Sequence, residues 1–389
     1  MRKKALALLI YFTAASPLSL SAGEQPKLIV SGYLLTDYQY YLNPGGKYSY
    51  VETSPGSGVY NRKDNVDYNT FEITRTYLHF KLYPIDKMKI QLTLDSRQDP
   101  VDTMYKLIVR YAFLEYALRP EAKFRVGLQY YPWTQYIHDV VWPYLMMELG
   151  YCIYWRIYPT ADLGASVLGG LFDDHLQYYV GIFNGEGFTN IENDKYKEYM
   201  AMLAGNFGNK DSVNGSIAAQ YSHHNKESAS FLDDGVSGAG VVNFWRIRLG
   251  GEFLYGTQTF KSGSFPEIDP KKYPVGYFDA LKAYRGPGSL LPRNTDVNYG
   301  GGAIYLVVKI LDKLDLVGRY DYYDPNFSPS YKNDEATMWM AGLVYKLPAG
   351  VQASLDFRQY IFAGEQVSSN RKYDAVPQNI IYTHWKIPF

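Results

Sequence analysis

The sequence predicts an all-β fold, a transmembrane antiparallel β-barrel of sixteen strands with long loops on one rim. Three observations support this prediction. Runs of about 9 to 16 residues alternate between apolar and polar side chains, the period of a strand with one apolar and one polar face. The connections between these runs alternate between short and long, as at the two rims of an outer-membrane barrel. Aromatic residues make up 17% of the chain, with 40 tyrosines, and rings with one polar end suit the two membrane interfaces.

Residues 1–22 have the features of a secretory signal peptide. A basic start, Arg2 to Lys4, is followed by an apolar run from Ala5 to about Ala15 and then by small residues. This run is too short to span a bilayer as a helix. We therefore expect cleavage near residues 21–23 and export of the chain, and residues 23–389 are then expected to form a single outer-membrane barrel domain.

The charge balance and the cysteine content argue against two other classes of protein. The chain carries 39 Lys and Arg against 39 Asp and Glu, so no basic surface for nucleic acid is indicated. The single cysteine, Cys152, rules out an internal disulfide framework. We expect Cys152 to be a packed or lipid-facing residue.

Two stretches show the strand alternation most clearly. In KMKIQLTLDSR, at 87–97, the apolar residues from Met88 to Leu94 face one way and the polar ones face the other. VQASLDFRQY, at 351–360, repeats this pattern. Soluble sheets also alternate, but their strands average about five or six residues, so the length favours a barrel wall. The pattern predicts strands at 27–42, 68–83, 87–98, 104–118, 122–130, 161–172, 175–185, 196–207, 213–224, 298–311, 315–324, 336–348, 351–362 and 378–389.

The segment 238–260 supplies the remaining pair of strands. The directions of the strands on either side require an even number between them, either two short strands bent at about Leu249–Gly251 or none, and two give sixteen. Sixteen strands are enough to enclose an aqueous channel. Short connections, such as 84–86 and 349–350, fall on one rim. Long connections fall on the other rim, at 43–67, 131–160, 225–237 and 261–297.

The chain ends in QNIIYTHWKIPF, residues 378–389, which we expect to be the closing strand of the barrel. Trp385 and Phe389 lie on its apolar side, toward lipid, whereas His384 and Lys386 alternate with them and point to the lumen. An aromatic last residue on the apolar face is unusual for a soluble domain, whose ends are commonly polar and frayed.

The polar faces of the strands predict which charged side chains line the lumen. An anion channel needs cations along its path, yet the alternation turns both signs of charge inward. Arg319 and Asp321 lie two residues apart on one face, as do Asp356 and Arg358, so each pair can neutralise itself or act as separate pore charges. The pore-lining candidates are Arg75, Lys81, Lys89, Asp95, Arg125, Arg319, Asp321, Asp356 and Arg358.

Several short motifs, spread over most of the chain expected after cleavage, occur in a familiar order. They include FEITRTYLHFKLYP at 71–84, RVGLQYYP at 125–132 and GIFNG at 181–185. Taken together, they resemble the phosphate-selective porin O and P family of outer-membrane porins. The resemblance implies a sixteen-stranded barrel, a homotrimer, and a long third loop that folds into the lumen and narrows it.

The stretch 130–160 stands where this third loop is expected. It is rich in aromatic and apolar residues, which do not suit a loop that moves freely in water. Long loops without secondary structure of their own are commonly functional in compact folds. We therefore expect it to pack against the inner wall and to set the narrowest point of the pore. Its candidate constriction residues are Trp133, His138, Asp139, Trp142, Glu148 and Arg156.

These features predict an outer-membrane porin of a Gram-negative-type bacterium, a water-filled channel for passive diffusion of small hydrophilic solutes or ions, with anions such as phosphate among the candidates. Its expected partners are outer-membrane lipids, the solutes and further copies of the chain in a homotrimer. The alternative is a plugged barrel that serves as an adhesin or an outer-membrane hydrolase.

The sequence offers no catalytic constellation, cofactor site or metal site for a hydrolase. A nucleophile needs a base and a polar third group in contact with it. The adjacent His223 and His224 point to opposite faces of a strand. The neighbouring His138 and Asp139 would need further carboxylates that the sequence does not place. We therefore do not expect an enzyme.

Overall fold

The computed structural model describes residues 26–43, 69–98, 105–155, 157–188, 192, 195–209, 212–224, 234–260, 295–324, 327, 335–362, 366–368, 371–373 and 378–389. The expected signal peptide, residues 1–22, and the constriction candidate Arg156 lie outside these ranges. Most residues of the predicted long loops at 43–67, 225–237 and 261–297 also lie outside them.

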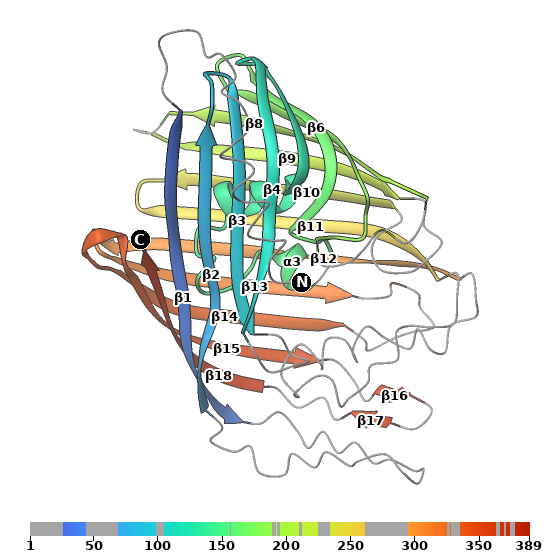
Figure 1. Ribbon diagram of the computed structural model, residues 1–389. Coiled ribbons are helices and arrows are strands. Elements are labelled where there is room, and N and C mark those ends of the chain that lie inside the picture. The colour runs from blue at the N-terminus through green and yellow to red at the C-terminus, as the bar shows by residue number, and fades with distance from the viewer. Residues whose placement is uncertain are drawn as a thin grey trace.

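Sixteen antiparallel strands close into a barrel (Figure 1). The strands are β1 (Lys27–Asn43), β2 (Asn69–Tyr83), β3 (Met88–Gln98), β4 (Tyr105–Arg119), β5 (Ala122–Tyr130), β6 (Ala161–Leu171), β7 (Leu176–Phe183), β8 (Glu198–Gly208), β9 (Asn214–His224), β10 (Asp234–Phe244), β11 (Ile247–Phe260), β12 (Thr295–Leu311), β13 (Leu314–Asp324), β14 (Ala336–Lys346), β15 (Gln352–Phe362) and β18 (Gln378–Pro388). A hairpin of β16 (Gln366–Ser368) and β17 (Arg371–Tyr373) forms a separate small sheet. The predicted sixteen-stranded barrel is confirmed.

The predicted bend at Leu249–Gly251 is wrong. The chain turns instead at Trp245 and Arg246, between β10 and β11. Gly250 lies inside β11, and a Cβ atom added to it would lie 3.1 Å from a methyl carbon of Val141. The glycine therefore makes room for a loop that packs inside the barrel, and it is not a turn residue.

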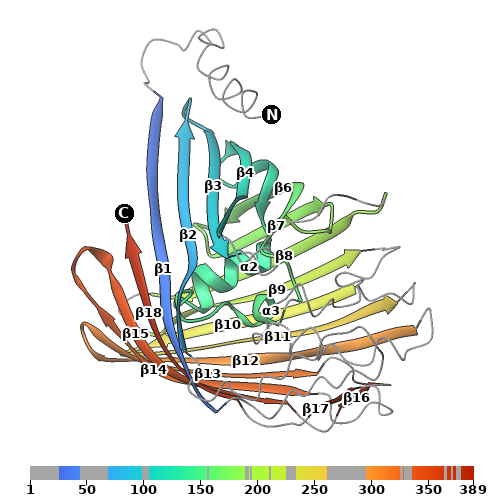
Figure 2. The ribbon, with the colours of Figure 1, turned by 60° about the horizontal axis from the view of Figure 1, so that its bottom comes forward.

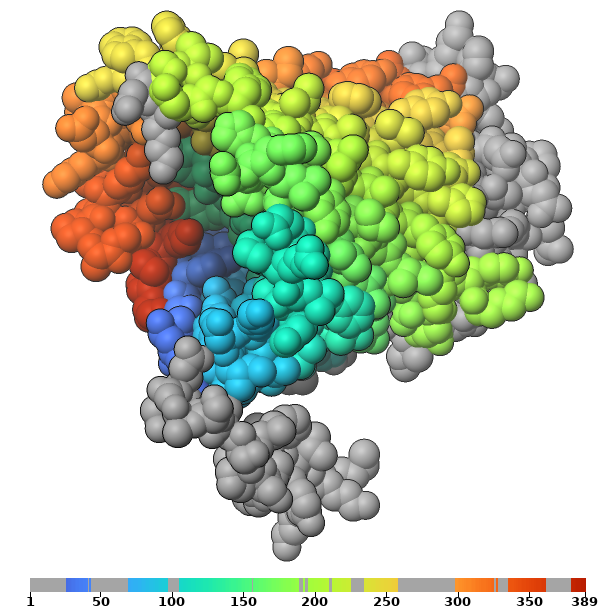
Figure 3. Space-filling model, turned by 90° about the horizontal axis from the view of Figure 1, so that it is seen from above, coloured from blue at the N-terminus to red at the C-terminus, as the bar shows by residue number. Residues whose placement is uncertain are grey.

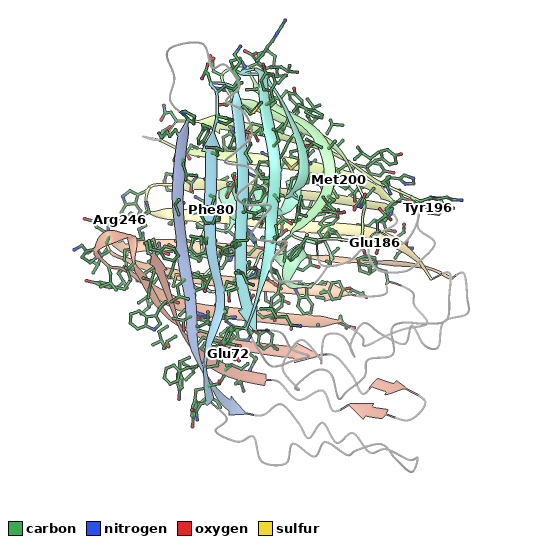
Figure 4. The ribbon with its side chains drawn as sticks, in the orientation of Figure 1. Glu72, Phe80, Glu186, Tyr196, Met200 and Arg246 are labelled. Carbon is green, nitrogen blue, oxygen red and sulfur yellow. The ribbon has the colours of Figure 1, made fainter. Side chains whose placement is uncertain are left out.

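The connections sort onto two opposite rims. Arg246, in the tight turn between β10 and β11, lies at one end of the barrel (Figure 4). Glu186 and Tyr196, in the longer connection between β7 and β8, lie at the other end. None of the helices in the described part of the chain is long and apolar enough to cross a membrane.

The outside of the barrel is apolar, with aromatic rings near both rims. Aliphatic side chains cover its middle, and charged residues of the strands turn to the inside instead. This is the distribution expected for an outer-membrane barrel, whose outer face contacts lipid and whose interfaces carry aromatic girdles. Exposed rings near the long-loop rim are Tyr199, Tyr221, Tyr255 and Tyr322, and those near the short-turn rim are Phe172, Phe207, Phe244 and Trp245.

The last residue of the chain closes the barrel. The Phe389 N–H donates to the Gly32 carbonyl at 3.0 Å, and the Gly32 N–H donates to the Phe389 carbonyl at 2.9 Å. The Phe389 ring covers the glycine, because a Cβ atom at Gly32 would lie 2.6 Å from two ring carbons. The seam between β1 and β18 therefore ends in a matched pair, an aromatic ring over a glycine, on the lipid side.

This seam gives a testable prediction. Replacing Phe389 by serine should lower the yield of folded barrel far more than it alters the conductance of the molecules that do fold, because the ring faces lipid and contacts no lumen residue. Heat-modifiable migration in SDS gels measures the folded fraction. The control is Trp385→Ser, which removes an outward ring from the same strand but not the closing pair. Equal yields of Phe389→Ser and wild-type barrel would contradict the prediction.

Candidate functional site

The connection between β5 and β6, residues 131–160, lies inside the ring of strands as the third loop (Figure 2). It contains α2 (Pro132–Tyr136), a π-helical turn, η1 (Ile137–Val141), and α3 (Tyr151–Tyr154). The Tyr131 N–H donates to the Thr160 carbonyl at 3.2 Å, so the loop leaves and re-enters the wall at one place. The predicted inward-folded third loop is therefore observed.

Aromatic side chains hold the third loop against one part of the wall, β7 to β15. The Trp142 ring stacks on Tyr305 with centroids 4.9 Å apart, and Trp155 stacks on Tyr323 at 5.0 Å. Such stacked rings bury large apolar areas, so water is excluded from this side of the lumen. The buried loop residues include Tyr131, Trp133, Ile137, Val141, Trp142, Tyr151, Cys152, Tyr154, Trp155 and Tyr158.

Glu252, on β11, is an acidic anchor for this loop. Its carboxylate accepts the Trp133 indole N–H at 3.1 Å and the Tyr151 backbone N–H at 2.6 Å. It also accepts the hydroxyl of Tyr305. A buried carboxylate with several donors is satisfied rather than stranded. This one residue therefore ties α2 and α3 to the same point of the wall.

The two strand-borne charge pairs considered from the sequence are both formed. Arg319 Nη2 lies 2.7 Å from Asp321, and Arg358 Nε lies 2.6 Å from Asp356. Arg358 also reaches the third loop, where its Nη1 lies 2.7 Å from Glu148. Both arginines face the interior, as the alternation predicts. The third loop covers them, and Arg319 and Arg358 are only 4% and 2% exposed.

The opposite part of the wall, β18 and β1 to β5, keeps charged side chains open to water. The side chains of Arg75 and Lys89 are 17% and 22% exposed, and Lys81 is also partly exposed. Glu115 pairs with Lys89 at 2.9 Å and with Arg125 at 2.6 Å. Arg75, Lys81, Lys89 and Glu115 are therefore charged groups that water can reach, whereas Asp37, Arg125 and His384 on the same part of the wall are buried.

Asp95 is the pore-lining candidate that is fully buried on this open side. Its carboxylate lies 3.4 Å from Arg110 and 3.7 Å from Arg75. The register between β3 and β4 shifts at a β-bulge, and the consecutive Arg110 and Tyr111 are both buried there. A bulge interrupts the strict alternation of faces. The interior charged residues that periodicity did not single out include Arg110, Glu115, Arg248 and Glu252.

The π-helical turn η1 carries His138 and Asp139 on the side of the loop that faces the open wall. Asp139 is exposed to the lumen, but the surrounding protein partly desolvates its carboxyl and raises its pKa, and the charge of Lys81 opposes this rise. Burial and neighbouring arginines lower the pKa of His138 to about 3. The imidazole is therefore neutral, and its Nε2 accepts the Gly150 N–H at 3.3 Å. Asp139 on the loop and Lys81 on the open wall thus carry opposite charges and are close enough to interact electrostatically.

A hollow of about 660 Å³ lies at the short-turn end of the open wall. Residues within 27–123 line it, beside the wider opening that Figure 3 shows between the blue N-terminal strands, the red C-terminal strands and the green strands from the middle of the chain. Basic side chains predominate in the lining of the hollow. Its charged residues are Lys27, Lys87, Lys89, Lys123, Asp86 and Glu115.

The two adjacent histidines of β9 lie in different surroundings. His224 is fully buried, whereas His223 is partly exposed and lies 2.8 Å from Asp234. The neighbouring Ser222 faces the interior and lies 3.2 Å from the Tyr158 hydroxyl. Within the described ranges, no group of three or more His, Cys, Asp and Glu side chains is placed to hold a metal ion.

Comparisons with known proteins show the fold alone. No protein-family model and no curated protein matches the sequence. The anion-selective porin from Comamonas acidovorans has a TM-score of 0.60 at 10% identity, over 94% of this chain and 100% of that chain. The outer-membrane channel DcaP of Acinetobacter baumannii gives 0.57 at 12%, over 95% and 100%. The trimer form of OmpT from Vibrio cholerae gives 0.56 at 12%, over 94% and 100%.

The chain therefore has the fold of an outer-membrane porin barrel. This likeness agrees with the apolar outer face, and together they place the protein in the outer membrane. The resemblance to the phosphate-selective porin O and P family remains a prediction, because no family model supports it.

The lone cysteine reports on the packing of the third loop. Cys152 is 1% exposed, and burial raises the pKa of its thiol, whereas the thiolate is the reactive form. We expect a water-soluble maleimide to leave Cys152 unmodified in the folded barrel and to label it after boiling in SDS, as measured by mass spectrometry. As a control, Asp139→Cys in a Cys152→Ala background should be labelled in the folded barrel. Rapid labelling of Cys152 in the folded wild-type protein would show that the loop leaves the wall.

Proposed function

We propose that this protein is an outer-membrane porin, a water-filled channel for the passive diffusion of small hydrophilic solutes and ions, with a preference for anions. The observation that carries the proposal is the one-sided packing of the third loop. The loop seals itself to β7–β15 through buried rings and the Glu252 anchor. On β1 to β5, by contrast, charged side chains such as Arg75, Lys81 and Lys89 keep their access to water. The loop covers one part of the wall and leaves the other open, and we propose that solutes and ions pass along the open part.

The preference for anions rests on the charges of the open wall. Rings and rows of cationic side chains favour the passage of anions. The partly exposed inward cations of this wall are Arg75, Lys81, Lys89, Lys123 and Lys386, and the partly exposed inward acids are Glu72 and Glu115. The lysine-lined hollow at the short-turn end extends the same sign of charge. Phosphate is one candidate anion, in line with the family resemblance.

The alternative, a plugged barrel that serves as an adhesin or an outer-membrane hydrolase, is less well supported. The third loop packs along one part of the wall, and Asp139 at its tip is exposed, which does not suit a full plug. A hydrolase would need a nucleophile beside His223, but Ser222 is turned inward to Tyr158. A channel therefore accounts for more of the observed contacts than a plugged adhesin or a hydrolase does.

We also propose that the porin works as a homotrimer. The resemblance to the phosphate-selective porin family implies this state, and one structurally similar protein, OmpT of Vibrio cholerae, is described in a trimer form. Crosslinking in intact outer membranes, read on SDS gels, tests it. A trimer ladder supports the proposal, and a crosslinked product no larger than the monomer contradicts it.

Shortening the third loop should widen the channel. Deleting residues 134–150 removes η1 and the tip that faces the open wall, so single-channel conductance in planar bilayers should rise severalfold. Heat-modifiable migration is the control that the shortened barrel still folds. If a folded deletion variant conducts like the wild type, the loop does not limit the passage.

Neutralising the open-wall lysines should shift ion selectivity. The double variant Lys81→Gln, Lys89→Gln should move the reversal potential in a salt gradient toward cations. The shift should fade as salt rises, because the Debye length falls from about 30 Å at 0.01 M to about 3 Å at 1 M. Lys195→Gln, an exposed lysine in the β7–β8 connection, is the control. An unchanged reversal potential at low salt in the double variant would remove these lysines from the limiting path.

A further inference from the structure

We infer that Arg248, Arg319 and Arg358 are positioning residues that hold the third loop on the wall, and that the buried Arg319 and Arg358 are not the charges that select permeating ions. This inference deepens the proposed function and rests on it. It separates two groups of interior cations that the strand alternation alone treats alike. The arginines of one group donate hydrogen bonds to carbonyls of the loop. The cations of the other group face the open wall.

The three arginines come from three different strands and meet consecutive parts of the loop. Arg358, on β15, donates to the Met147 carbonyl at 2.5 Å. Arg319, on β13, donates to the Leu149 carbonyl. The loop between η1 and α3 has irregular backbone, and among the described residues no backbone N–H donates to its Met147 and Leu149 carbonyls. A buried carbonyl without a donor is costly, so these guanidinium groups supply the bonds that the backbone lacks.

Arg248, on β11, donates hydrogen bonds to backbone carbonyls at the end of η1. Its Nη2 donates to the Val140 carbonyl and its Nε to the Val141 carbonyl, the latter at 3.4 Å. Its Nη1 donates to Asn243 on the neighbouring strand at 3.1 Å. One side chain thus joins the wall to two successive carbonyls of the π-helical turn.

Acidic neighbours fix the direction in which the other two arginines point. Arg319 donates from Nε and Nη2 to the two oxygens of Asp321, both at 2.7 Å, which leaves Nη1 for the loop. Arg358 donates from Nε to Asp356 at 2.6 Å, which leaves Nη1 for Glu148 and Nη2 for the Met147 carbonyl, both in the loop, and Nη2 also lies 2.7 Å from His384 Nε2. This use of a planar fork with several donors is specific to arginine, and lysine cannot reproduce it.

The same pairing removes these arginines from ion selection. Each of Arg319 and Arg358 has a carboxylate in direct contact and almost no exposed surface. An ion in the passage therefore meets a neutral pair behind a layer of aromatic side chains. Lys81 and Lys89 on the open wall remain partly exposed and act on the ion directly.

The test keeps the positive charge of each arginine but removes its planar guanidinium group. In Arg319→Lys and Arg358→Lys, the charge stays but the fork is lost, so the loop should detach more often. We expect the rate of maleimide labelling of Cys152 in the folded barrel to rise about tenfold to a hundredfold, the change expected when one or two hydrogen bonds to a charged group are lost. The reversal potential should stay close to the wild-type value. Arg246→Lys, in an exposed turn, is the matched control and should leave the labelling rate unchanged.

Two results would overturn the inference. Cys152 that stays protected in both lysine variants would show that these arginines do not hold the loop. Normal protection in the lysine variants together with a reversal potential shifted in Arg319→Gln and Arg358→Gln would show that they act as pore charges. If the wall variants fail to fold, Glu148→Gln removes the loop partner of Arg358 from the other side, and faster Cys152 labelling is again expected. If the wild type forms no channel, the proposed function fails, but the labelling rates still decide the role of the arginines.

Discussion

The contact between the third loop and the β7–β15 wall is the constraint on which the rest of the interior depends. A barrel of sixteen strands encloses a space wide enough for a water-filled channel. The hydrogen bonds between its strands do not determine what fills that space. Here a loop of aromatic residues occupies one part of the space, held by stacked rings and by the buried Glu252. The loop turns one side of the lumen into a dry core. It leaves the other side as a charged, hydrated surface.

This division explains why interior charges of one sign behave in two ways. A charge in a dry core is tolerated only when it is paired and hydrogen-bonded, and Arg319 and Arg358 each meet a carboxylate two residues away on the same strand. A charged side chain that water can reach does not need an ionic partner. Among the described residues Lys81 has no ion pair, and Lys89 shares Glu115 with Arg125. We therefore propose that ion selectivity and the position of the loop depend on different residues.

Much of the barrel could be predicted from the sequence, because a strand with lipid on one side and water on the other must alternate. The strand count, the sorting of connections and the inward loop follow from that pattern and from the apolar loop composition. The turn near 249–251 was misplaced because Gly250 serves loop packing instead, and Arg110 was missed because a bulge breaks the alternation. For Arg319 and Arg358 the pattern predicts the side they face. It cannot predict that a distant loop covers them, since that depends on tertiary packing.

The most direct test of a passage along β1 to β5 is block of single-channel current by a charged, water-soluble thiol reagent at two positions in a Cys152→Ala barrel. Lys81→Cys places the thiol on the open wall. Ser237→Cys places it under the loop, where Ser237 is fully buried against Tyr158. A passage on the open side predicts a stepwise loss of current for Lys81→Cys and none for Ser237→Cys. Block at Ser237→Cys with no effect at Lys81→Cys would show that ions pass on the other side of the loop.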